Sequence, residues 1–179
     1  MILMINGAFG VGKTSLAERL VNEIPNSMLF DPENVGFFLR EILPDDVKQR
    51  EADSGDFQDF KLWKELTVQV AEHLVSTYQM LLIVPMTIRN KNYLDYIRSG
   101  FEKVDEDTHH FCLLAKKETI FERLRERGEE EGNWCFQQAD SCLKAFEEED
   151  FHTYIETDHK PLSQVVEEIK ETIEKPPSL

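Results

Sequence analysis

The sequence predicts a three-layer α/β/α fold in which helices cover both faces of a five-stranded parallel sheet. Short apolar runs alternate with longer segments of helical periodicity along the chain, which is the pattern of β–α units. Several runs are apolar without alternation, as expected for strands that are buried on both faces. The length of 179 residues, of which 41% are hydrophobic, suits a single domain spanning residues 1–179.

Five apolar runs are expected to form the strands of this sheet. They begin with MILMIN at the start of the chain and include MLLIVPM near its middle. We expect the strands near residues 1–6, 27–31, 80–86, 109–115 and 152–157. Parallel strands need crossover connections, so each gap between strands must hold at least one helix.

Helical periodicity fills these gaps. In the first gap, Leu16, Leu20 and Ile24 share one helix face, and Pro25 ends the helix. A short helix is expected around residues 37–42. Further helices are predicted at 57–78, 91–101, 117–127, 134–147 and 162–174. The polar stretches 44–56 and 127–133 are predicted to be surface loops.

The composition excludes several kinds of partner. The net charge is −15, so the phosphates of a nucleic acid would be repelled. Basic stretches that would bind an anionic membrane surface are missing, and no stretch is long enough for a signal peptide or a membrane span. The three cysteines have no metal-ligand spacing and are typical of free core thiols in a reducing cytoplasm. We therefore expect a cytoplasmic protein with a small-molecule partner.

The stretch INGAFGVGKTSL matches the phosphate-binding pattern G-x-x-x-x-G-K-[ST] in full, between an apolar strand and an amphipathic helix. Its glycines let the backbone wrap around phosphate oxygens, and the helix start adds its positive dipole end. Lys13 supplies a positive charge to the β- and γ-phosphates, and the Thr14 hydroxyl can ligate Mg²⁺. The sequence therefore predicts a P-loop that binds ATP with Mg²⁺. The expected contacts are Gly7, Ala8, Phe9, Gly10, Val11, Gly12, Lys13, Thr14 and Ser15.

Two other classes of P-loop protein fit the sequence less well. A GTPase would read guanine with N-K-x-D, but in NKNYLD the aspartate comes two residues late. A mechanical ATPase usually carries an acidic residue at the end of a sheet strand, whereas Pro85 and Met86 occupy the end of the third run. The small-kinase class fits better, because its remaining parts can be located in the chain.

Asp31 follows the second strand, at the sheet edge where open parallel sheets bind their ligands. Its carboxylate can take a proton from an acceptor hydroxyl or hold Mg²⁺ through water. Asp31 is equally well suited to be the N-cap of the next helix, because Pro32 follows it. The two roles are compatible, and Glu33 is a weaker candidate for the same chemistry.

Two arginines are candidates for binding the acceptor. Arg40 lies on the helix after Asp31, and Arg89 follows the third strand. A guanidinium group can hold an anionic or hydroxyl-rich molecule, and a solvated surface side chain is the alternative for each arginine. Trp134 can serve as lid packing or as a platform for the substrate, although core packing is the more common fate of a tryptophan.

Residues 123–140 are predicted to form a small lid. Arg123 and Arg127 share one helix face, and a polar segment flanked by glycines follows them. Pairing of these arginines with nearby glutamates is the alternative interpretation. At the end of the fifth strand, Thr157 and Asp158 are expected to border the nucleotide base, where backbone groups can read adenine.

A family resemblance is carried by six segments: INGAFGVGKT, DPENVGFFLR, DFQDFKLW, LLIVPMTI, HHFCLLAKKETIFERLRER and IETD. In this order they resemble the ATP-binding tunicamycin-resistance proteins of bacteria, within the nucleotide and shikimate kinase group. The resemblance implies an adenylate-kinase-like core with strand order 2-3-1-4-5, a cytoplasmic location and a link to resistance against a nucleoside antibiotic. It also implies that Arg123 lies over adenine and Arg127 near the phosphates.

Two functions from different classes remain open. The first is an ATP-dependent phosphotransferase that modifies a hydroxyl of a nucleoside-like or sugar-bearing molecule, with Lys13, Asp31 and Arg127 as catalytic residues. The second is an ATP-dependent protein that sequesters a nucleoside antibiotic without phosphoryl transfer, and a weak ATPase or switch is a third. The lid segment GEEEGN lacks the further arginines of nucleotide kinases, so fewer cations would neutralise a moving phosphoryl group.

Overall fold

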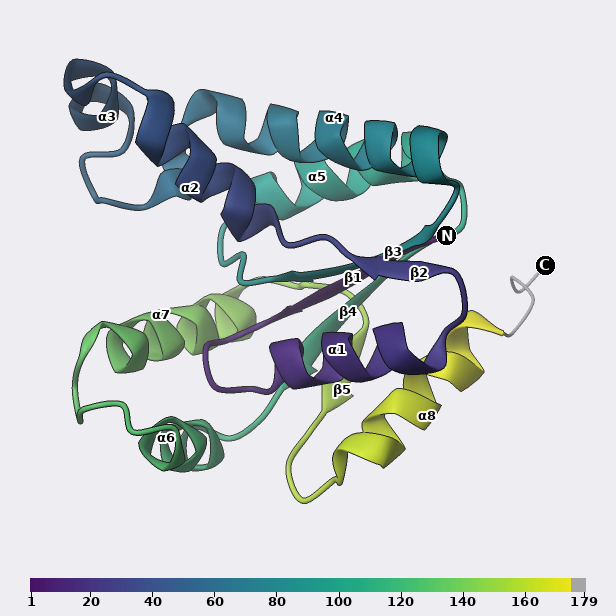
Figure 1. Ribbon diagram of the computed structural model, residues 1–179. Helices are drawn as coiled ribbons and strands as arrows, with labels where there is room; N and C mark the ends of the chain where they lie inside the picture. Colours follow the sequence, from purple (N-terminus) through teal and green to yellow (C-terminus); the bar gives the residue numbers. More distant parts are fainter. Residues whose placement is uncertain (175–179) are drawn as a thin grey trace.

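The structure is a computed structural model that describes residues 1–174, and these residues form a five-stranded parallel sheet (Figure 1). The strands are β1 (Ile2–Gly7), β2 (Ser27–Leu29), β3 (Leu81–Met86), β4 (Thr108–Leu114) and β5 (Tyr154–Glu156). Their order in the sheet is β2-β3-β1-β4-β5. The predicted fold class and strand order are therefore confirmed. Residues 175–179, at the end of the expected domain, lie outside the described residues.

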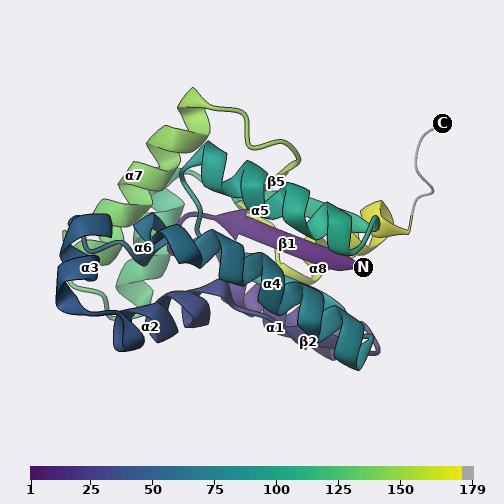
Figure 2. The same ribbon diagram turned by 90° about the horizontal axis from the view of Figure 1, so that it is seen from above.

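Helices cover the sheet on both faces, as Figures 1 and 2 show. The described part of the chain contains α1 (Lys13–Glu23), α2 (Pro32–Ile42), α3 (Asp45–Glu51), α4 (Lys61–Tyr78), α5 (Lys91–Val104), α6 (Lys117–Glu126), α7 (Trp134–Glu148) and α8 (Leu162–Ile173). Helices α4 and α5 pack together on one face, and α1 and α8 pack together on the other. Helices α2, α3, α6 and α7 extend past the carboxyl ends of the strands, on the left of Figure 1.

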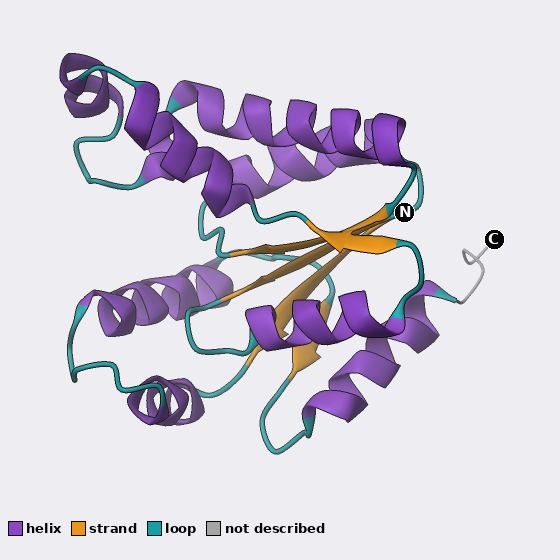
Figure 3. Cartoon of the chain, viewed as in Figure 1, coloured by secondary structure: helices purple, strands orange, loops and turns teal. Residues whose placement is uncertain are grey.

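Strand β1 is the centre of the sheet and leads directly into the P-loop. All six of its residues are buried, because β3 and β4 flank it and helices cover both faces. This explains why the run MILMI carries no polar alternation. Since every strand is parallel, the loops that follow β1, β2, β3 and β4 meet at one edge of the sheet (Figure 3).

The polar stretch 44–56 was predicted to be a loop, and this prediction is wrong for its first half. Helix α3 occupies Asp45–Glu51, directly after Pro44. Asp45 and Asp46 lie in its first turn, and Lys48 and Arg50 lie in its last turn. These charges complement the helix dipole at both ends, so a helix with no buried residue can form here.

The long helix predicted at 57–78 is interrupted near its start. Residues Phe57–Asp59 form a separate 3₁₀ turn, and α4 begins at Lys61 after the extended residue Phe60. Phe57 and Phe60 are both buried, so this break turns two aromatic rings into the core. Asp56 caps the turn by accepting a hydrogen bond from the backbone N–H of Gln58. The result is a rigid corner next to the carboxyl end of β3.

The three cysteines are free thiols, as the sequence predicts. Cys112 and Cys142 are buried in the core, whereas Cys135 is half-buried. Burial raises the pKa of Cys112 to about 12 and that of Cys142 to about 11, so both thiols stay protonated. Within residues 1–174, no helix combines the length and the apolar character that crossing a membrane requires.

Candidate active site

The P-loop runs from Gly7 to Thr14 and joins β1 to α1. Gly12 is the N-cap of α1 and has φ = 109°, in the left-handed region that favours glycine. At Gly7 a side chain has no room, because a Cβ would lie 2.8 Å from Val11 Cγ1 and 3.0 Å from the Leu113 carbonyl oxygen. The two glycines of the motif are therefore required for different reasons. Gly12 adopts the left-handed conformation that closes the turn, and Gly7 lets the loop lie against β4.

The side chain of Lys13 folds back over the P-loop. Its Nζ donates a hydrogen bond to the Ala8 carbonyl oxygen at 2.9 Å, and it lies 5.5 Å from the centre of the Phe9 ring. Burial lowers the pKa of Lys13 to about 8, although the negative charge of Glu33 partly offsets this effect. A half-buried ammonium group with one carbonyl acceptor is well suited to gain phosphate oxygens as further partners.

Three cavities follow one another along the carboxyl edge of the sheet. The α8 cavity, of about 400 Å³, lies between the P-loop and the start of α8 and is lined by Arg123, Thr157 and Leu162 among others. The P-loop cavity, of about 150 Å³, contains Lys13 and Thr14. The α2 cavity, of about 480 Å³, lies between α2 and α7.

The cavities share lining residues, so they are neighbours along this edge. The P-loop cavity shares Gly10, Gly12 and Arg127 with the α8 cavity. It shares Phe9, Glu33 and Thr87 with the α2 cavity. Of the other predicted P-loop contacts, Val11 and Ser15 line the α8 cavity.

Asp31 and Glu33 bring two carboxylates to the P-loop cavity. Asp31 is the N-cap of α2 and accepts a hydrogen bond from the backbone N–H of Glu33 at 2.9 Å. Burial raises the pKa of both carboxyl groups, and the charge of Asp31 raises that of Glu33 further, while Lys13 lowers both. Only Glu33 of this pair also lines the α2 cavity.

The oxygen atoms of the P-loop cavity suit Mg²⁺. The Thr14 hydroxyl and the Asp31 carboxylate belong to the same cavity, and Pro85 lines it where an acid is expected in a mechanical ATPase. Mg²⁺ commonly takes one or two carboxylates together with phosphate oxygens and waters. The described residues contain no group of three or more His, Cys, Asp or Glu that would hold a metal by itself. A metal ion would therefore depend on the phosphates for most of its ligands.

Arg123 closes the α8 cavity at the junction of three segments. It donates hydrogen bonds to the Val11 carbonyl oxygen at 2.9 Å, to the Thr157 carbonyl oxygen at 3.1 Å and to Thr157 Oγ1 at 3.2 Å. Asp158, unlike Thr157, does not bind Arg123. Its carboxylate accepts hydrogen bonds from the Lys116 backbone N–H at 2.8 Å and from the Thr119 hydroxyl at 2.5 Å. The side chain of Asp158 thus stabilises the start of α6, which leaves its backbone for the predicted contact with the base.

The predicted lid, residues 123–140, consists of the end of α6, the loop 127–133 and the first half of α7. Arg127 is exposed and lines both the P-loop cavity and the α8 cavity. Trp134 is 59% exposed and contacts Phe9 of the P-loop edge-on, with ring centres 5.1 Å apart. Of the three fates named for Trp134, core packing is wrong, because α7 turns its first residue toward the P-loop and the α2 cavity. The roles of lid packing and substrate platform stay predictions.

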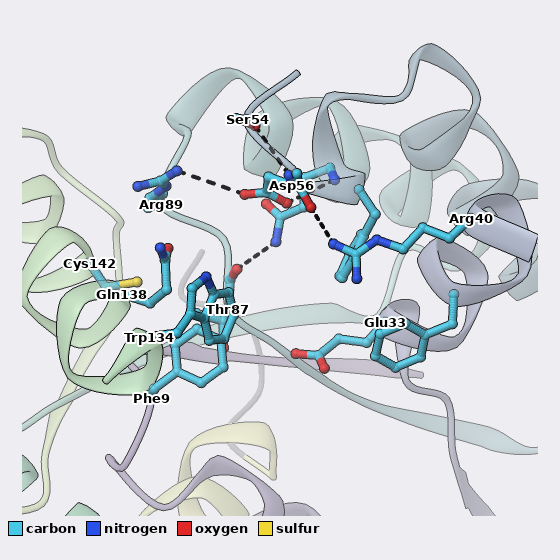
Figure 4. A pocket seen from close by; sticks show the side chains of 14 residues that line it. Phe9, Glu33, Arg40, Ser54, Asp56, Thr87, Arg89, Trp134, Gln138 and Cys142 are labelled. Atoms are coloured by element: carbon cyan, nitrogen blue, oxygen red, sulfur yellow. Dashed lines mark hydrogen bonds and ion pairs between the residues drawn. The ribbon is translucent and has the colours of Figure 1, made fainter. Parts of the chain in front are cut away.

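The α2 cavity is bordered by both arginines that the sequence singles out (Figure 4). Arg40 donates a hydrogen bond to the Gly55 carbonyl oxygen, and its guanidinium lies 5.1 Å from the centre of the Phe57 ring. Arg89 forms an ion pair with Asp56 at 3.8 Å. The arginines therefore brace the segment 54–57 while they face the cavity. Figure 4 shows Glu33 reaching in opposite Phe9 and Trp134.

Sequence reasoning singled out Arg89 after β3 but missed Thr87 and Ile88, which lie between this strand and Arg89. Asn6 is fully buried and binds the backbone of Ile88 twice, with Oδ1 accepting from the N–H at 2.8 Å and Nδ2 donating to the carbonyl oxygen at 2.9 Å. Gln58 donates a hydrogen bond from Nε2 to the Thr87 carbonyl oxygen at 2.8 Å. An asparagine inside the apolar run that leads into the P-loop was the available sign, because a buried amide needs partners.

Comparisons with known proteins agree with this geometry. The family profile of the AAA domain matches residues 3–154. The structure of the tunicamycin resistance protein of Deinococcus radiodurans is similar at 32% identity, with a TM-score of 0.77 and 98% of each chain covered.

Two kinases resemble the chain in fold alone. A sugar kinase from Janibacter sp. HTCC2649 has 18% identity and a TM-score of 0.65, with 95% of this chain and 92% of that chain covered. Shikimate kinase from Acinetobacter baumannii has 15% identity and a TM-score of 0.60, with 96% and 92% covered. A search of curated protein sequences gives no match.

Fold and site together define a P-loop protein of the nucleotide and shikimate kinase-like group. Within this group, the identity of 32% over almost the whole chain decides the family. The chain belongs to the tunicamycin resistance protein family.

Proposed function

We propose that this protein is an ATP-dependent phosphotransferase that phosphorylates a hydroxyl group of a nucleoside-like or sugar-bearing small molecule. The observation that carries the proposal is the row of three neighbouring cavities. The α8 cavity is the right place for adenine and ribose, the P-loop cavity for the phosphates, and the α2 cavity for the acceptor. A pure nucleotide-binding switch has no need of the third cavity.

The chemistry of the proposed step needs few groups. The acceptor oxygen forms a bond to the γ-phosphorus while the bond from that phosphorus to the β,γ-bridging oxygen breaks, and ADP leaves. The acceptor proton passes to a carboxylate of the pair Asp31 and Glu33. Lys13 and Arg127 bind the phosphate oxygens on which negative charge gathers.

Mg²⁺ would be held by Thr14, by phosphate oxygens and, through water, by Asp31. Its contribution is to neutralise charge on the β- and γ-phosphates. The backbone near Thr157 and the guanidinium of Arg123 frame the proposed adenine position. ATP is therefore expected to bind better than GTP.

The walls of the α2 cavity favour a ring-bearing acceptor. Phe9, Phe37, Phe57 and Trp134 provide aromatic surface, and Arg40 and Arg89 provide donors at the rim. Aromatic rings contact the apolar faces of bases and sugars, and guanidinium groups bind their oxygen atoms. The tunicamycin resistance protein of Deinococcus radiodurans makes a nucleoside antibiotic the first compound to test. We propose a cytoplasmic location, in keeping with three free thiols.

Sequestration of such a compound without phosphoryl transfer is the alternative function, and one feature of the lid favours it. In the lid loop, Glu131 accepts two hydrogen bonds from Arg125, so this arginine is held away from the phosphates. Arg127 is then the lid arginine that lines the P-loop cavity. Fast transfer usually employs more cations around the moving group.

Incubation with ATP labelled in its γ-phosphate, Mg²⁺ and tunicamycin or simpler nucleosides tests the proposal. Mass spectrometry should find a phosphorylated acceptor. Asp31→Asn and Glu33→Gln remove one charge each at nearly constant size. The variant that lacks the base should form product about 100-fold more slowly, with ATP affinity nearly unchanged.

Glu41→Gln, an exposed acid on α2, is the control and should behave as wild type. If tunicamycin binds in the presence of ATP, no acceptor is phosphorylated and both variants still protect cells, sequestration is the function.

A further inference from the structure

One buried hydroxyl next to the P-loop has no role in the chemistry described so far. Thr87, just after β3, is only 7% exposed. Among the described residues, its Oγ1 has no hydrogen-bond partner. Buried hydroxyl groups in native proteins are nearly always paired, because an unpaired one destabilises the fold. A partner that arrives with a ligand would explain this exception.

The position of Thr87 indicates which ligand group that partner is. Thr87 lines both the P-loop cavity and the α2 cavity, and so do Phe9 and Glu33. In the P-loop cavity it faces the same space as Lys13 and Thr14, which are the phosphate-binding residues of the motif. A phosphoryl group that moves from ATP to an acceptor must cross the boundary between these two cavities.

The backbone around Thr87 is fixed relative to the P-loop. Gln58 holds the carbonyl oxygen of Thr87, and Asn6 binds the next residue, Ile88, through both of its backbone groups. Asn6 directly precedes Gly7, the first residue of the P-loop. The separation between Thr87 and the phosphate-binding loop is therefore set by the sheet and does not depend on closure of the lid.

We propose that Thr87 is a γ-phosphate-binding residue. Rotation of its side chain about χ1 exchanges Oγ1 with the methyl group and turns the hydroxyl into the cavity, where it donates a hydrogen bond to an oxygen of the γ-phosphate. A neutral donor suits this place, because the end of β3 carries Pro85 and Met86 and no acid. The inference rests on the proposed binding of ATP, and it adds a hydrogen-bond donor to a phosphate site whose lid carries few cations.

The test compares the affinities of the whole protein for ADP and for the β,γ-imido analogue of ATP, both with Mg²⁺, by calorimetry. Thr87→Val keeps the shape and removes the hydroxyl. We expect it to bind the ATP analogue about tenfold more weakly, with ADP affinity within about twofold of wild type. Its melting temperature should not fall, because no existing hydrogen bond is lost. Thr87→Ser keeps a hydroxyl and should retain the preference for the ATP analogue.

Thr67→Val is the matched control, because Thr67 is also buried but already donates its hydroxyl to the Trp63 carbonyl oxygen at 2.8 Å. It should melt at a lower temperature and keep the wild-type ratio of the two affinities. An unchanged ratio in Thr87→Val, or a loss of preference in Thr87→Ser equal to that in Thr87→Val, would overturn the inference. Failure to phosphorylate any acceptor leaves this ratio intact and counts against the transferase function alone.

Discussion

The pKa of Lys13 depends on residues far from the P-loop in the sequence, which the sequence motif does not describe. The motif brings the ammonium group to the loop, but its low pKa of about 8 comes from burial, which the charge of Glu33 on α2 only partly offsets. The positive charge that the phosphates need is therefore held at a cost to the folded state. The phosphate oxygens of the proposed nucleotide would offset this cost, because they would give the ammonium group negatively charged partners.

A measurable pH dependence follows for Lys13. Bound phosphates should raise its pKa from about 8 toward 10.5 or above, so ATP binding takes up a proton in that pH range and weakens as the pH rises through 8. Calorimetry at pH 9 in buffers with different heats of ionisation measures the uptake. Lys13→Arg stays charged and should show no uptake, whereas Lys13→Ala should lose ATP binding with the fold intact. ATP affinity that is flat between pH 7 and pH 9.5 would contradict the assignment.

The stability effect of Lys13 has the opposite sign to its binding effect. Between pH 8 and pH 10.5 the unfolded chain holds this proton while the folded protein has released it. The contribution of Lys13 to the free energy of unfolding therefore rises with pH across this window. Chemical denaturation of wild type and Lys13→Met at several pH values isolates this contribution.

The two lid arginines should differ, although they share one helix face. Arg123→Ala should reduce affinity for adenosine and ATP alike, and it should lower the melting temperature because three hydrogen bonds to Val11 and Thr157 are lost. Arg127→Ala should weaken ATP binding and slow turnover while adenosine affinity and melting temperature stay near wild type. Arg98→Ala removes a cation from α5 and is the control. Equal effects of Arg123→Ala and Arg127→Ala on adenosine affinity would contradict the assignment of Arg123 to adenine and Arg127 to the phosphates.

At the scale of elements, the close approach of α2 to the 3₁₀ turn shapes the α2 cavity. Gly36 on α2 faces Phe57, and a Cβ at this position would lie 2.2 Å from Phe57 Cδ2. The Phe57 ring in turn contacts Phe37 and Trp63, with ring centres 5.7 Å and 5.9 Å away. One glycine thus lets a helix and a corner meet tightly enough to build the proposed acceptor site.

Gly36→Ala should disturb the contact between α2 and the 3₁₀ turn and should affect the α2 cavity more than the P-loop cavity. We expect a loss of about 1–3 kcal/mol in the free energy of unfolding, because the ring has packed neighbours and cannot move freely. Tunicamycin binding, followed by calorimetry, should weaken while ATP affinity is nearly unchanged.

Gly100→Ala is the matched control for Gly36→Ala, since its Cβ would lie 2.5 Å from Val68 Cγ2 where α5 crosses α4. It should destabilise the protein to a similar degree without affecting either ligand. Equal loss of ATP and tunicamycin affinity in Gly36→Ala would mean that the contact between Gly36 and Phe57 stabilises the whole fold and does not shape the α2 cavity in particular.

At the scale of the whole molecule, the proposed function requires an acidic protein to attract an anionic nucleotide. The net charge of −15 would repel the proposed ATP at a distance, while Lys13, Arg127 and the start of α1 would attract it at close range. Salt screens the distant charges more than the close contacts. The screening length falls from about 30 Å at 0.01 M salt to about 8 Å at 0.15 M.

The association rate of ATP should therefore rise with salt. Stopped-flow measurements with a fluorescent ATP analogue at several KCl concentrations would show this, and fluorescent adenosine, which carries no phosphate charge, should show little dependence. A rate that falls with salt would mean that the cations of the site dominate the field that ATP meets during its approach.

Local patterns were enough to predict the strands, most helices, the P-loop and the N-cap at Asp31. These features depend on residues that are close together in the chain: apolar periodicity, a glycine-rich spacing and a proline after an aspartate. The strand order came with the family resemblance, and the structure confirms it. Helix α3 was missed because its stability comes from charges at both ends and not from an apolar face.

Only the tertiary structure decided how distant residues meet at the carboxyl edge of the sheet. The pairing of β1 with β3 brings Asn6 to Ile88 and thereby sets Thr87 beside the P-loop, 74 positions along the chain from Lys13. The same arrangement lets Glu33 line two cavities and brings Trp134 into contact with Phe9. It also lets the side chain of Asp158 accept a hydrogen bond at the start of α6. The physical reason is that such contacts depend on strand register and helix packing, which join segments that no local pattern connects.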